Sequence, residues 1–247
     1  YTKEERRRVT LHHNRAKRPV PEKSATETLR TSFPRPLHAF GILLFINLSL
    51  IFAWFFIEPH FPFYVFEELG WTTAQFGSTI SFYGWALLIG SLALGQSSDR
   101  FGRKSVLIVG LILHSAQYVG LMLTNAYWVI IAAFILAGLG ESLVTPALSA
   151  SFLDITPEEH RARVMGINTA IGSLGSLSAP ALVMFIIRFI PPQSVFLVSA
   201  VLILFTGLLA LTSLRLPTRV EAARELALEV SQERIMAAQS ALHKVAI

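Results

Sequence analysis

Long stretches without a charged side chain divide this sequence, and they constrain its fold more than any other feature. They run over Pro36–Ile57, Leu69–Ser98, Ser105–Gly140, Ser142–Leu153, Val164–Ile187 and Phe189–Leu214. A helix needs about 20 predominantly apolar residues to cross a bilayer. Ser105–Leu153 holds 49 residues with one charge, Glu141, so it must contain two helices, which a break at 124–126 with the polar residues Thr124 and Asn125 separates. The sequence therefore predicts six spanning helices, near 38–63, 74–96, 104–123, 127–152, 162–188 and 192–214.

The distribution of charge excludes a soluble enzyme and divides the chain into three regions. Residues 37–213 hold only 14 of the 37 charged side chains, whereas an ordinary soluble domain carries about 25% charged residues. We expect an all-α membrane protein with a basic cytoplasmic linker at 1–36, a six-helix transmembrane domain at 37–214 and a cytoplasmic tail at 215–247. Glutamates recur every four residues in that tail, which predicts an amphipathic helix.

Lysine and arginine indicate the orientation. Ten precede residue 37, five follow residue 214, and five lie in the two loops that six spans place on the same side; Arg188 alone lies opposite. This positive-inside bias predicts cytoplasmic termini. We expect the membrane to be the plasma membrane of the cell. The net charge of +5 flanks apolar segments, so we expect the lipid bilayer and no nucleic acid as a partner. The chain has no cysteine, which excludes thiolate metal and redox sites, and we expect neither a metal nor a cofactor.

The most specific motif joins the second and third predicted spans. It reads Gly95-Gln96-Ser97-Ser98-Asp99-Arg100-Phe101-Gly102-Arg103-Lys104. Gly95 is expected to let a neighbouring helix approach closely, and Gly102 to permit a tight turn. Asp99 is expected to pair with a nearby cation or to accept bonds at a helix N-terminus. The three cations, Arg100, Arg103 and Lys104, are expected to hold the loop on the cytoplasmic side.

As a pattern, G-x-x-x-D-R-x-G-R-K after the second of six spans resembles the signature loop of the major facilitator superfamily of secondary transporters. The resemblance covers residues 37–214. It implies one half of a bundle of twelve helices, with this loop taking part in gating. The connector Thr156-Pro157-Glu158-Glu159 is similar to one that is common in the family, and locally it predicts a capping box between Thr156 and Glu159.

Several features indicate which half this is. The fourth span lacks the arginine that many first halves of proton-coupled drug exporters carry, and residues 1–36 resemble the linker between the halves. The chain therefore resembles helices seven to twelve, and its partner is expected to be the missing N-terminal half. A complete six-helix transporter that forms homodimers remains an alternative, although a chain that begins with Tyr1 fits it poorly.

Small residues in the fifth span predict close helix packing. Gly166, Gly175 and the pair Ala179-Pro180 resemble a glycine-rich motif of antiporters, with alanine in place of its last glycine. Gly172, Ser176 and Pro180 also form a stripe at helical spacing, which is how membrane helices pack together.

Polar side chains within the spans are the candidates for a solute and ion pathway, because charges in a membrane are costly. Glu141 lies near the middle of the fourth span, and burial favours its use as a proton or cation site. Glu58 and His60 stand beside Pro59 and Pro62, which break the first helix, and could form a gate or binding cluster. Further candidates are Asn47, Trp54, Tyr83 and Asn168. His114, on a span that is peripheral in the family, is interpreted as a packing residue.

These features predict secondary active transport of a small solute by alternating access, with ion-coupled efflux as the direction and a proton as the coupling ion. No P-loop is present, and the spans offer too few paired histidine, aspartate or serine side chains for an intramembrane enzyme. The alternative is a six-helix scaffold or receptor that does not transport.

Overall fold

The structure is a computed structural model, and it describes residue 34 and residues 36–95 and 97–216. In these ranges six helices are long and apolar enough to cross a bilayer, as the sequence predicts. They are α3 (Leu37–Ile57), α5 (Thr73–Leu94), α7 (Arg103–Leu123), α8 (Tyr127–Asp154), α9 (Arg161–Ile186) and α10 (Pro192–Ser213). The described residues contain no β-strand. Most of the predicted linker and tail, including the tail's amphipathic helix, lies outside the described residues.

The first span ends at Ile57, earlier than the predicted residue 63. Pro59 has no backbone N–H with which to continue α3, and its ring clashes with the preceding turn. The chain resumes as the short helix α4 (Phe61–Phe63) and the π-helical turn η1 (Tyr64–Glu68). The predicted break at the prolines is therefore confirmed. We call the end of the bundle formed by residues 58–72, 124–126 and 187–191 the α4 end.

Two short elements lie at the opposite end, which we call the α6 end. They are α6 (Ser97–Phe101) and the 3₁₀ turn η2 (Glu158–His160). Gly102, between α6 and α7, has a φ of +87°, a conformation that side-chain-bearing residues rarely adopt. This glycine therefore makes the tight turn that leads from α6 into α7.

The capping box predicted at Thr156 is wrong. The Thr156 hydroxyl donates to the carbonyl of Phe152, because α8 continues to Asp154 and Thr156 completes its last turn. The residue before η2 is Pro157, which offers no side-chain cap. A capping box is found instead at the start of α5, where Thr72 and Gln75 each bond the other's backbone N–H.

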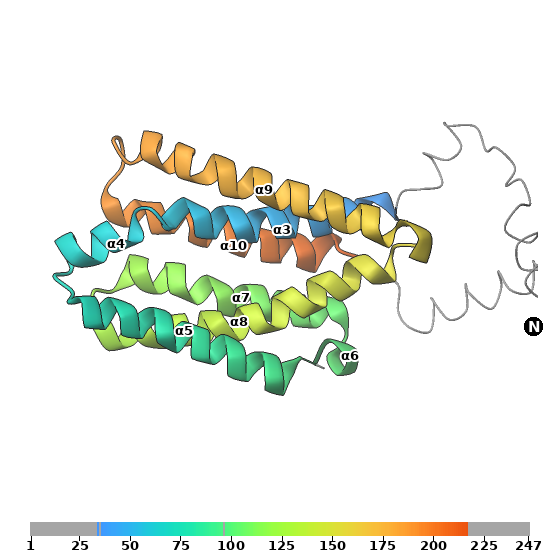
Figure 1. The fold of residues 1–247 in the computed structure, drawn as a ribbon, viewed down its shortest axis with the longest axis horizontal. Coiled ribbons are helices and arrows are strands. Elements are labelled where there is room, and N and C mark those ends of the chain that lie inside the picture. Colours follow the sequence, from blue (N-terminus) through green and yellow to red (C-terminus); the bar gives the residue numbers. More distant parts are fainter. Residues whose placement is uncertain (1–33, 35, 96, 217–247) are drawn as a thin grey trace, which may run out of the picture. The chain divides into compact units, whose positions relative to one another are not determined.

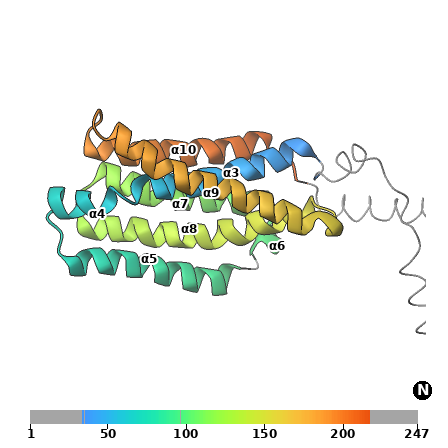
Figure 2. The ribbon, with the colours of Figure 1, turned by 45° about the horizontal axis from the view of Figure 1, so that its top comes forward.

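The six helices form two groups of three that face each other (Figures 1 and 2). In one group α3 packs against α9 and α10, and in the other α8 packs against α5 and α7. Contacts between α7 and α10 join the groups. If the chain is divided into two halves of three spans, the first spans of the halves, α3 and α8, have changed places. The helix α3 packs with the last two spans, and α8 packs with the second and third. This exchange is consistent with two three-helix repeats that share one core.

Two glycines of α8 let this helix lie unusually close to its neighbours. A Cβ atom at Gly138 would meet the backbone of Tyr83 and Leu87 on α5. A Cβ atom at Gly140 would overlap the backbone of His114 on α7. Small residues at such points allow backbone-to-backbone contact between membrane helices. The residue that follows Gly140, the predicted site residue Glu141, is therefore fixed against both α5 and α7.

Candidate solute cavity

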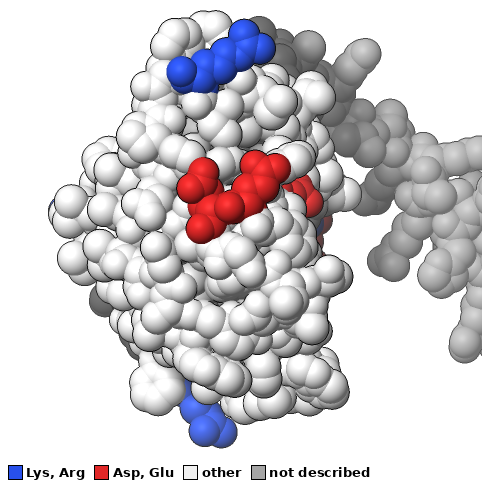
Figure 3. Space-filling model, turned by 90° about the vertical axis from the view of Figure 1, so that its left-hand side faces the viewer, with Lys and Arg blue, Asp and Glu red and all other residues white. Residues whose placement is uncertain are grey.

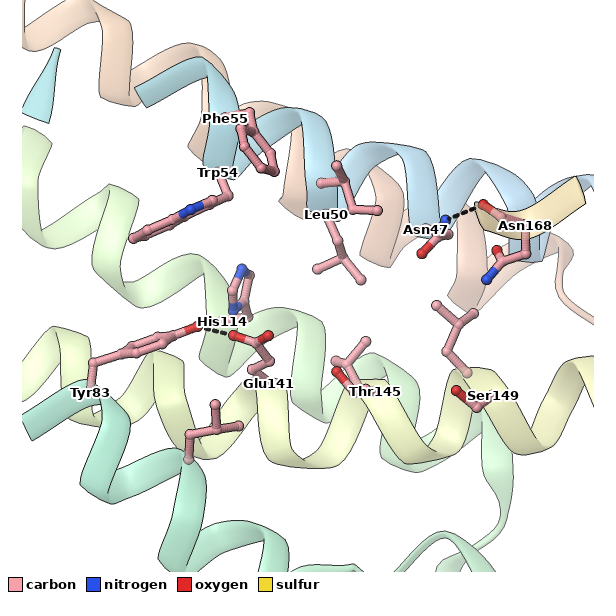
Figure 4. Close-up of a pocket in the computed structure, with 14 residues that line it drawn as sticks. Asn47, Leu50, Trp54, Phe55, Tyr83, His114, Glu141, Thr145, Ser149 and Asn168 are labelled. Atoms are coloured by element: carbon pink, nitrogen blue, oxygen red, sulfur yellow. Dashed lines mark hydrogen bonds between the residues drawn. The ribbon is translucent and has the colours of Figure 1, made fainter. Parts of the chain in front are cut away.

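A cavity of about 470 Å³ lies between the two helix groups. Five of the six long helices contribute to its wall, and Figure 4 shows their side chains pointing into it. Its volume is within the range of small-molecule sites in proteins. The lining residues are Asn47, Leu50, Ile51, Trp54, Phe55, Tyr83, Leu87, His114, Glu141, Val144, Thr145, Leu148, Ser149 and Asn168. Five of the seven predicted pathway residues are therefore brought together here.

Glu141 is the acidic side chain of this wall, and it is held by Tyr83. The Tyr83 hydroxyl on α5 donates a hydrogen bond to Oε2 of Glu141 on α8 (Figure 4). No lysine or arginine is among the lining residues, and the ion pairs of the described residues do not include Glu141. The negative charge of an ionised Glu141 would therefore be stabilised only by the neutral Tyr83 hydroxyl and by whatever occupies the cavity.

Aromatic contacts fix Tyr83 in this orientation. Its ring stacks on Trp54 of α3 with the centroids 6.3 Å apart and the planes 14° from parallel. Phe134 of α8 meets the same ring edge-on, at 6.3 Å and 71°. Stacked and edge-on pairs are the favoured arrangements of aromatic rings. The predicted residues Trp54 and Tyr83 thus form a flat aromatic wall that reaches from one helix group to the other.

Asn47 and Asn168 connect α3 with α9 farther along the cavity. The Asn47 side-chain amide donates to the backbone carbonyl of Asn168 at 3.0 Å (Figure 4). The side-chain oxygen of Asn168 is buried and has no hydrogen-bond partner among the described residues. A buried acceptor without a partner costs about 1–3 kcal/mol, so this oxygen is available to a ligand.

The structure adds His114 to the candidates, a residue that the sequence assigns to packing. It lies on α7, is only 4% exposed and lines the cavity beside Glu141 (Figure 4). Gly110 on the same helix packs against Gly140 of α8, and this close approach carries His114 to the cavity. The sequence contains no local signal for this position, because nothing in it indicates that Gly110 and Gly140 face each other.

Glu58 and His60 do not belong to this cavity. Glu58 is exposed at the end of α3, whereas His60 is buried and its Nε2 lies 3.1 Å from the carbonyl of Pro192. Burial lowers the pKa of His60 below its ordinary value of 6.5, and the bond with Pro192 and the charge of Glu68 offset this only in part. The cluster expected between Glu58 and His60 is therefore not formed, because the break at Pro59 sends the two side chains into different surroundings.

A second cavity, also of about 470 Å³, lies at the α4 end. Figure 3 looks onto this end and shows acidic side chains gathered near its middle. His60, Glu67 and Glu68 line the cavity together with apolar residues of α9, and Glu58 does not. The sequence indicates His60 here but not Glu67 and Glu68, which stand at the C-terminal end of the π-helical turn.

The signature loop is held together by Arg103. Its guanidinium lies 3.1 Å from Asp99 of α6 and 2.7 Å from Asp154 at the end of α8, and it donates to Ser98 at 3.0 Å. The expected pairing of Asp99 with a loop cation is thus present, and Asp154 is a partner that the sequence did not indicate. Arg100 is exposed and Lys104 is half-buried, both at the α6 end.

The predicted roles of the glycines differ from site to site. At Gly95, a Cβ atom would meet only the Ser91 carbonyl of its own helix among the described residues, so the expected approach of another helix is not found. Gly172 and Gly175 of α9 pack against Ile51, Asn47, Leu48 and Phe52 of α3, as expected for a packing stripe. Gly166 faces open space, and Pro180 is half-buried within α9.

Comparison with known proteins agrees with this geometry. Residues 43–244 match the family model of the Major Facilitator Superfamily. An uncharacterized MFS-type transporter, YhjO of Bacillus subtilis, is 31% identical over 151 residues, which is 61% of this chain and 36% of that protein. The multidrug resistance protein MdtH of Photorhabdus laumondii is 26% identical over 55% of this chain and 34% of its own. The quinolone resistance protein NorA of Staphylococcus aureus is 26% identical over 57% of this chain and 36% of its own length.

Solved structures share the fold at low sequence identity. A peptide transporter POT in complex with sulfate has a TM-score of 0.65 and 18% identity, covering 90% of this chain and 48% of that one. A D-xylose-proton symporter has a TM-score of 0.56 and 18% identity, and the match covers 83% of this chain and 52% of the symporter chain. The chain thus spans about a third of the length of these curated relatives and about half of these structures. It belongs to the major facilitator superfamily and is an integral membrane protein that crosses the bilayer several times.

Proposed function

We propose that this chain is one six-helix half of a secondary active transporter that exports a small organic solute by alternating access. The observation that carries the proposal is the pair Tyr83–Glu141 in the wall of a cavity within the spans. An ionisable side chain at membrane depth is costly and normally serves a function. Export is favoured because two relatives are, by name, a multidrug resistance protein and a quinolone resistance protein.

Glu141 is the coupling site of this proposal, and a proton is the coupling ion. Because no lysine or arginine lines the described wall, the ionised carboxylate has no fixed counter-ion there. Bringing an unpaired charge into a closed, dry cavity is strongly unfavourable. The cavity therefore closes when a proton or a positively charged solute neutralises Glu141, and exchange of one for the other drives export.

The rest of the wall suits an amphiphilic solute with an aromatic part. The stacked rings of Trp54 and Tyr83 offer a flat apolar surface. The amides of Asn47 and Asn168 offer polar atoms at the other end, including the unpartnered oxygen of Asn168. A few placed polar groups in a mainly apolar cavity are typical of small-molecule sites.

The proposed partner is a second six-helix half that covers α5 and α9. These two helices are the least buried of the six within the described residues. Each presents glycines, Gly77 and Gly84 on α5 and Gly166 on α9, whose Cβ positions meet nothing. Glycines on a membrane helix favour close contact with another helix. Coverage of only about a third of the curated relatives also supports a missing half.

The proposed orientation places the α6 end in the cytoplasm of the cell, across the plasma membrane. The described cations of the loops, Arg100, Arg103, Lys104, Arg161 and Arg163, lie at or near that end, and Arg188 follows α9 at the α4 end. This distribution supports cytoplasmic termini by the positive-inside rule.

The proposal is tested by export from cells that express the protein from its own complete gene. Ethidium and norfloxacin serve as probes, and their efflux is followed by fluorescence with and without a proton gradient. Glu141→Gln, which keeps the shape of the side chain but holds no charge, should abolish the part of efflux that depends on the gradient. Glu159→Gln, an exposed acid at the α6 end, is the matched control and should export like the unchanged protein.

The scaffold or receptor alternative makes the opposite prediction. In that case neither probe is exported above the level of cells without the gene, and Glu141→Gln leaves cellular activity intact. Equal gradient-driven efflux by Glu141→Gln and the unchanged protein would remove Glu141 from the coupling role.

A further inference from the structure

His114 is a buried ionisable group that the proposed mechanism does not use. It belongs to α7, yet its side chain reaches the cavity that Glu141 lines (Figure 4). The overlap that a Cβ at Gly140 would make with the His114 backbone shows that the two helices touch at this point. Since Glu141 follows Gly140 directly, the imidazole and the carboxyl are carried by two backbones in contact.

The surroundings of the imidazole fit more than one protonation state. Its Nε2 lies 3.4 Å from both the amide nitrogen of Gln117 and the hydroxyl of Tyr118. An amide that turns over presents either a donor or an acceptor, and a hydroxyl acts as both. The Gln117 side-chain oxygen is buried without a partner, so turning this amide loses no existing hydrogen bond of the oxygen. Nε2 therefore keeps partners whether or not it carries a proton.

The other ring nitrogen, Nδ1, lacks a hydrogen-bond partner of acceptable geometry among the described residues. This atom is buried, and the backbone of Ala137 on α8 lies near it. A packing histidine normally has both nitrogens satisfied, because an unpaired buried polar atom costs about 1–3 kcal/mol. The unpartnered atom in this structure lies on a residue that lines the cavity beside a carboxyl group.

We propose that His114 is a second proton-holding group of the Glu141 site, so that one proton passes between the carboxyl and the imidazole. In this step the O–H bond of Glu141 breaks and an N–H bond forms at Nδ1, while Nε2 keeps its own proton. The products are a carboxylate and an imidazolium, and the net charge of the pair does not change. The proposal rests on the coupling role of Glu141 and adds the place to which its proton moves.

Few other ionisable groups face this pair. The described neighbours are Tyr83 on α5 and Tyr118 on α7 itself. The helix α10, which also packs against α7, contains no ionisable side chain in Pro192–Ser213. When the net charge of the pair changes, no other charged side chain of the described wall balances it. One proton makes the pair neutral, and its release leaves a single negative charge for the solute to neutralise.

The test is an infrared titration of the full-length protein in lipid, which does not depend on transport. The band of the protonated Glu141 carboxyl is identified by its loss in Glu141→Gln. In His114→Asn, which is polar but holds no proton, the pH at which this band disappears should move by about one unit or more, as for coupled sites. The imidazole signal of His114 should move by a similar amount in Glu141→Gln, because coupling is reciprocal.

Controls separate this effect from altered packing. Ser115→Ala removes a buried hydroxyl that bonds only the carbonyl of Ile112 on the same helix, and it should leave the carboxyl titration unchanged. His114→Gln repeats the test if His114→Asn does not fold. An unchanged carboxyl titration in a folded His114 variant overturns the proposal. Export that is independent of Glu141 together with coupled titrations would instead refute the proposed function and leave the proton pair in place.

Discussion

The hydroxyl of Tyr83 donates a hydrogen bond to the carboxylate of Glu141, and the ring of Tyr83 stacks on Trp54. One tyrosine of α5 therefore contacts both α8 of its own group and α3 of the opposite group. Movement of the two groups relative to each other must disturb one of these contacts. We therefore expect Tyr83 to respond both to the charge on Glu141 and to the separation of the groups.

Replacing Tyr83 by phenylalanine separates these two contacts. Tyr83→Phe keeps the stacking on Trp54 and removes the hydrogen bond to the carboxyl group. A hydrogen bond to a charged group contributes about 1.5–3 kcal/mol, so gradient-driven efflux should fall about tenfold or more. Tyr127→Phe, which loses a bond to Ser78 outside the cavity, is the matched control. Equal efflux by the two variants would show that the Tyr83 hydroxyl does not stabilise the carboxylate during transport.

Arg103 is expected to keep the α6 end closed, because it ties the signature loop to Asp154 at the end of α8. This chain has no cysteine, so in full-length protein from which any cysteine outside this chain has been removed, a single Ser149→Cys change in the cavity reports access to a thiol reagent. Adding Arg103→Ala should speed its labelling from the cytoplasmic side several-fold. Arg103→Lys keeps the charge but cannot reach Asp99, Ser98 and Asp154 together, and should give an intermediate rate. Labelling rates that do not differ among these proteins would exclude a gating role for this arginine.

Close contact at Gly140 is expected to be essential for packing α8 on α7. In Gly140→Ala the added methyl group overlaps the backbone of His114, and overpacking of this kind costs about 1–3 kcal/mol. The melting temperature in detergent should fall accordingly. Gly41→Ala adds the same group in open space on α3, outside the proposed contact surface of α5 and α9, and should leave the melting temperature almost unchanged. A fall of equal size in both variants would argue against the close contact.

His60 is expected to make stability sensitive to mild acid. Burial lowers its pKa below 6.5, so below that pH the unfolded chain binds a proton that the folded chain does not. Stability is therefore lost as the pH falls from about 7 to below 6. The drop in melting temperature between these pH values should be smaller in His60→Gln. His38→Gln, at an exposed histidine of α3, should keep the full drop.

How far the sequence predicts the structure depends on the range of the interaction concerned. The six spans and the break at Pro59 follow from local properties, namely runs without charge and a missing N–H group. Asn47, Trp54, Tyr83, Glu141 and Asn168 are pathway candidates from their places within the spans, and all five line the cavity. Residues near helix ends were predicted less well, because Thr156 was assigned to the following helix although it completes α8.

Other features could not be derived from one sequence, because they depend on which faces of the helices meet. His114 was assigned to packing since nothing local indicates that Gly110 and Gly140 face each other. Glu58 was assigned to the pathway because it stands in an apolar stretch, yet the proline break leaves it exposed. The bond between Arg103 and Asp154 joins residues 51 positions apart, and no spacing rule connects them.

The central claim is that Glu141 couples a proton to solute movement, and it is tested most directly by comparing two modes of transport in proteoliposomes of the full-length protein. Exchange of labelled for unlabelled norfloxacin needs no net proton movement, whereas accumulation against a gradient does. We predict that Glu141→Gln keeps exchange and loses accumulation driven by an imposed pH gradient. Accumulation by Glu141→Gln at the level of the unchanged protein would contradict the claim.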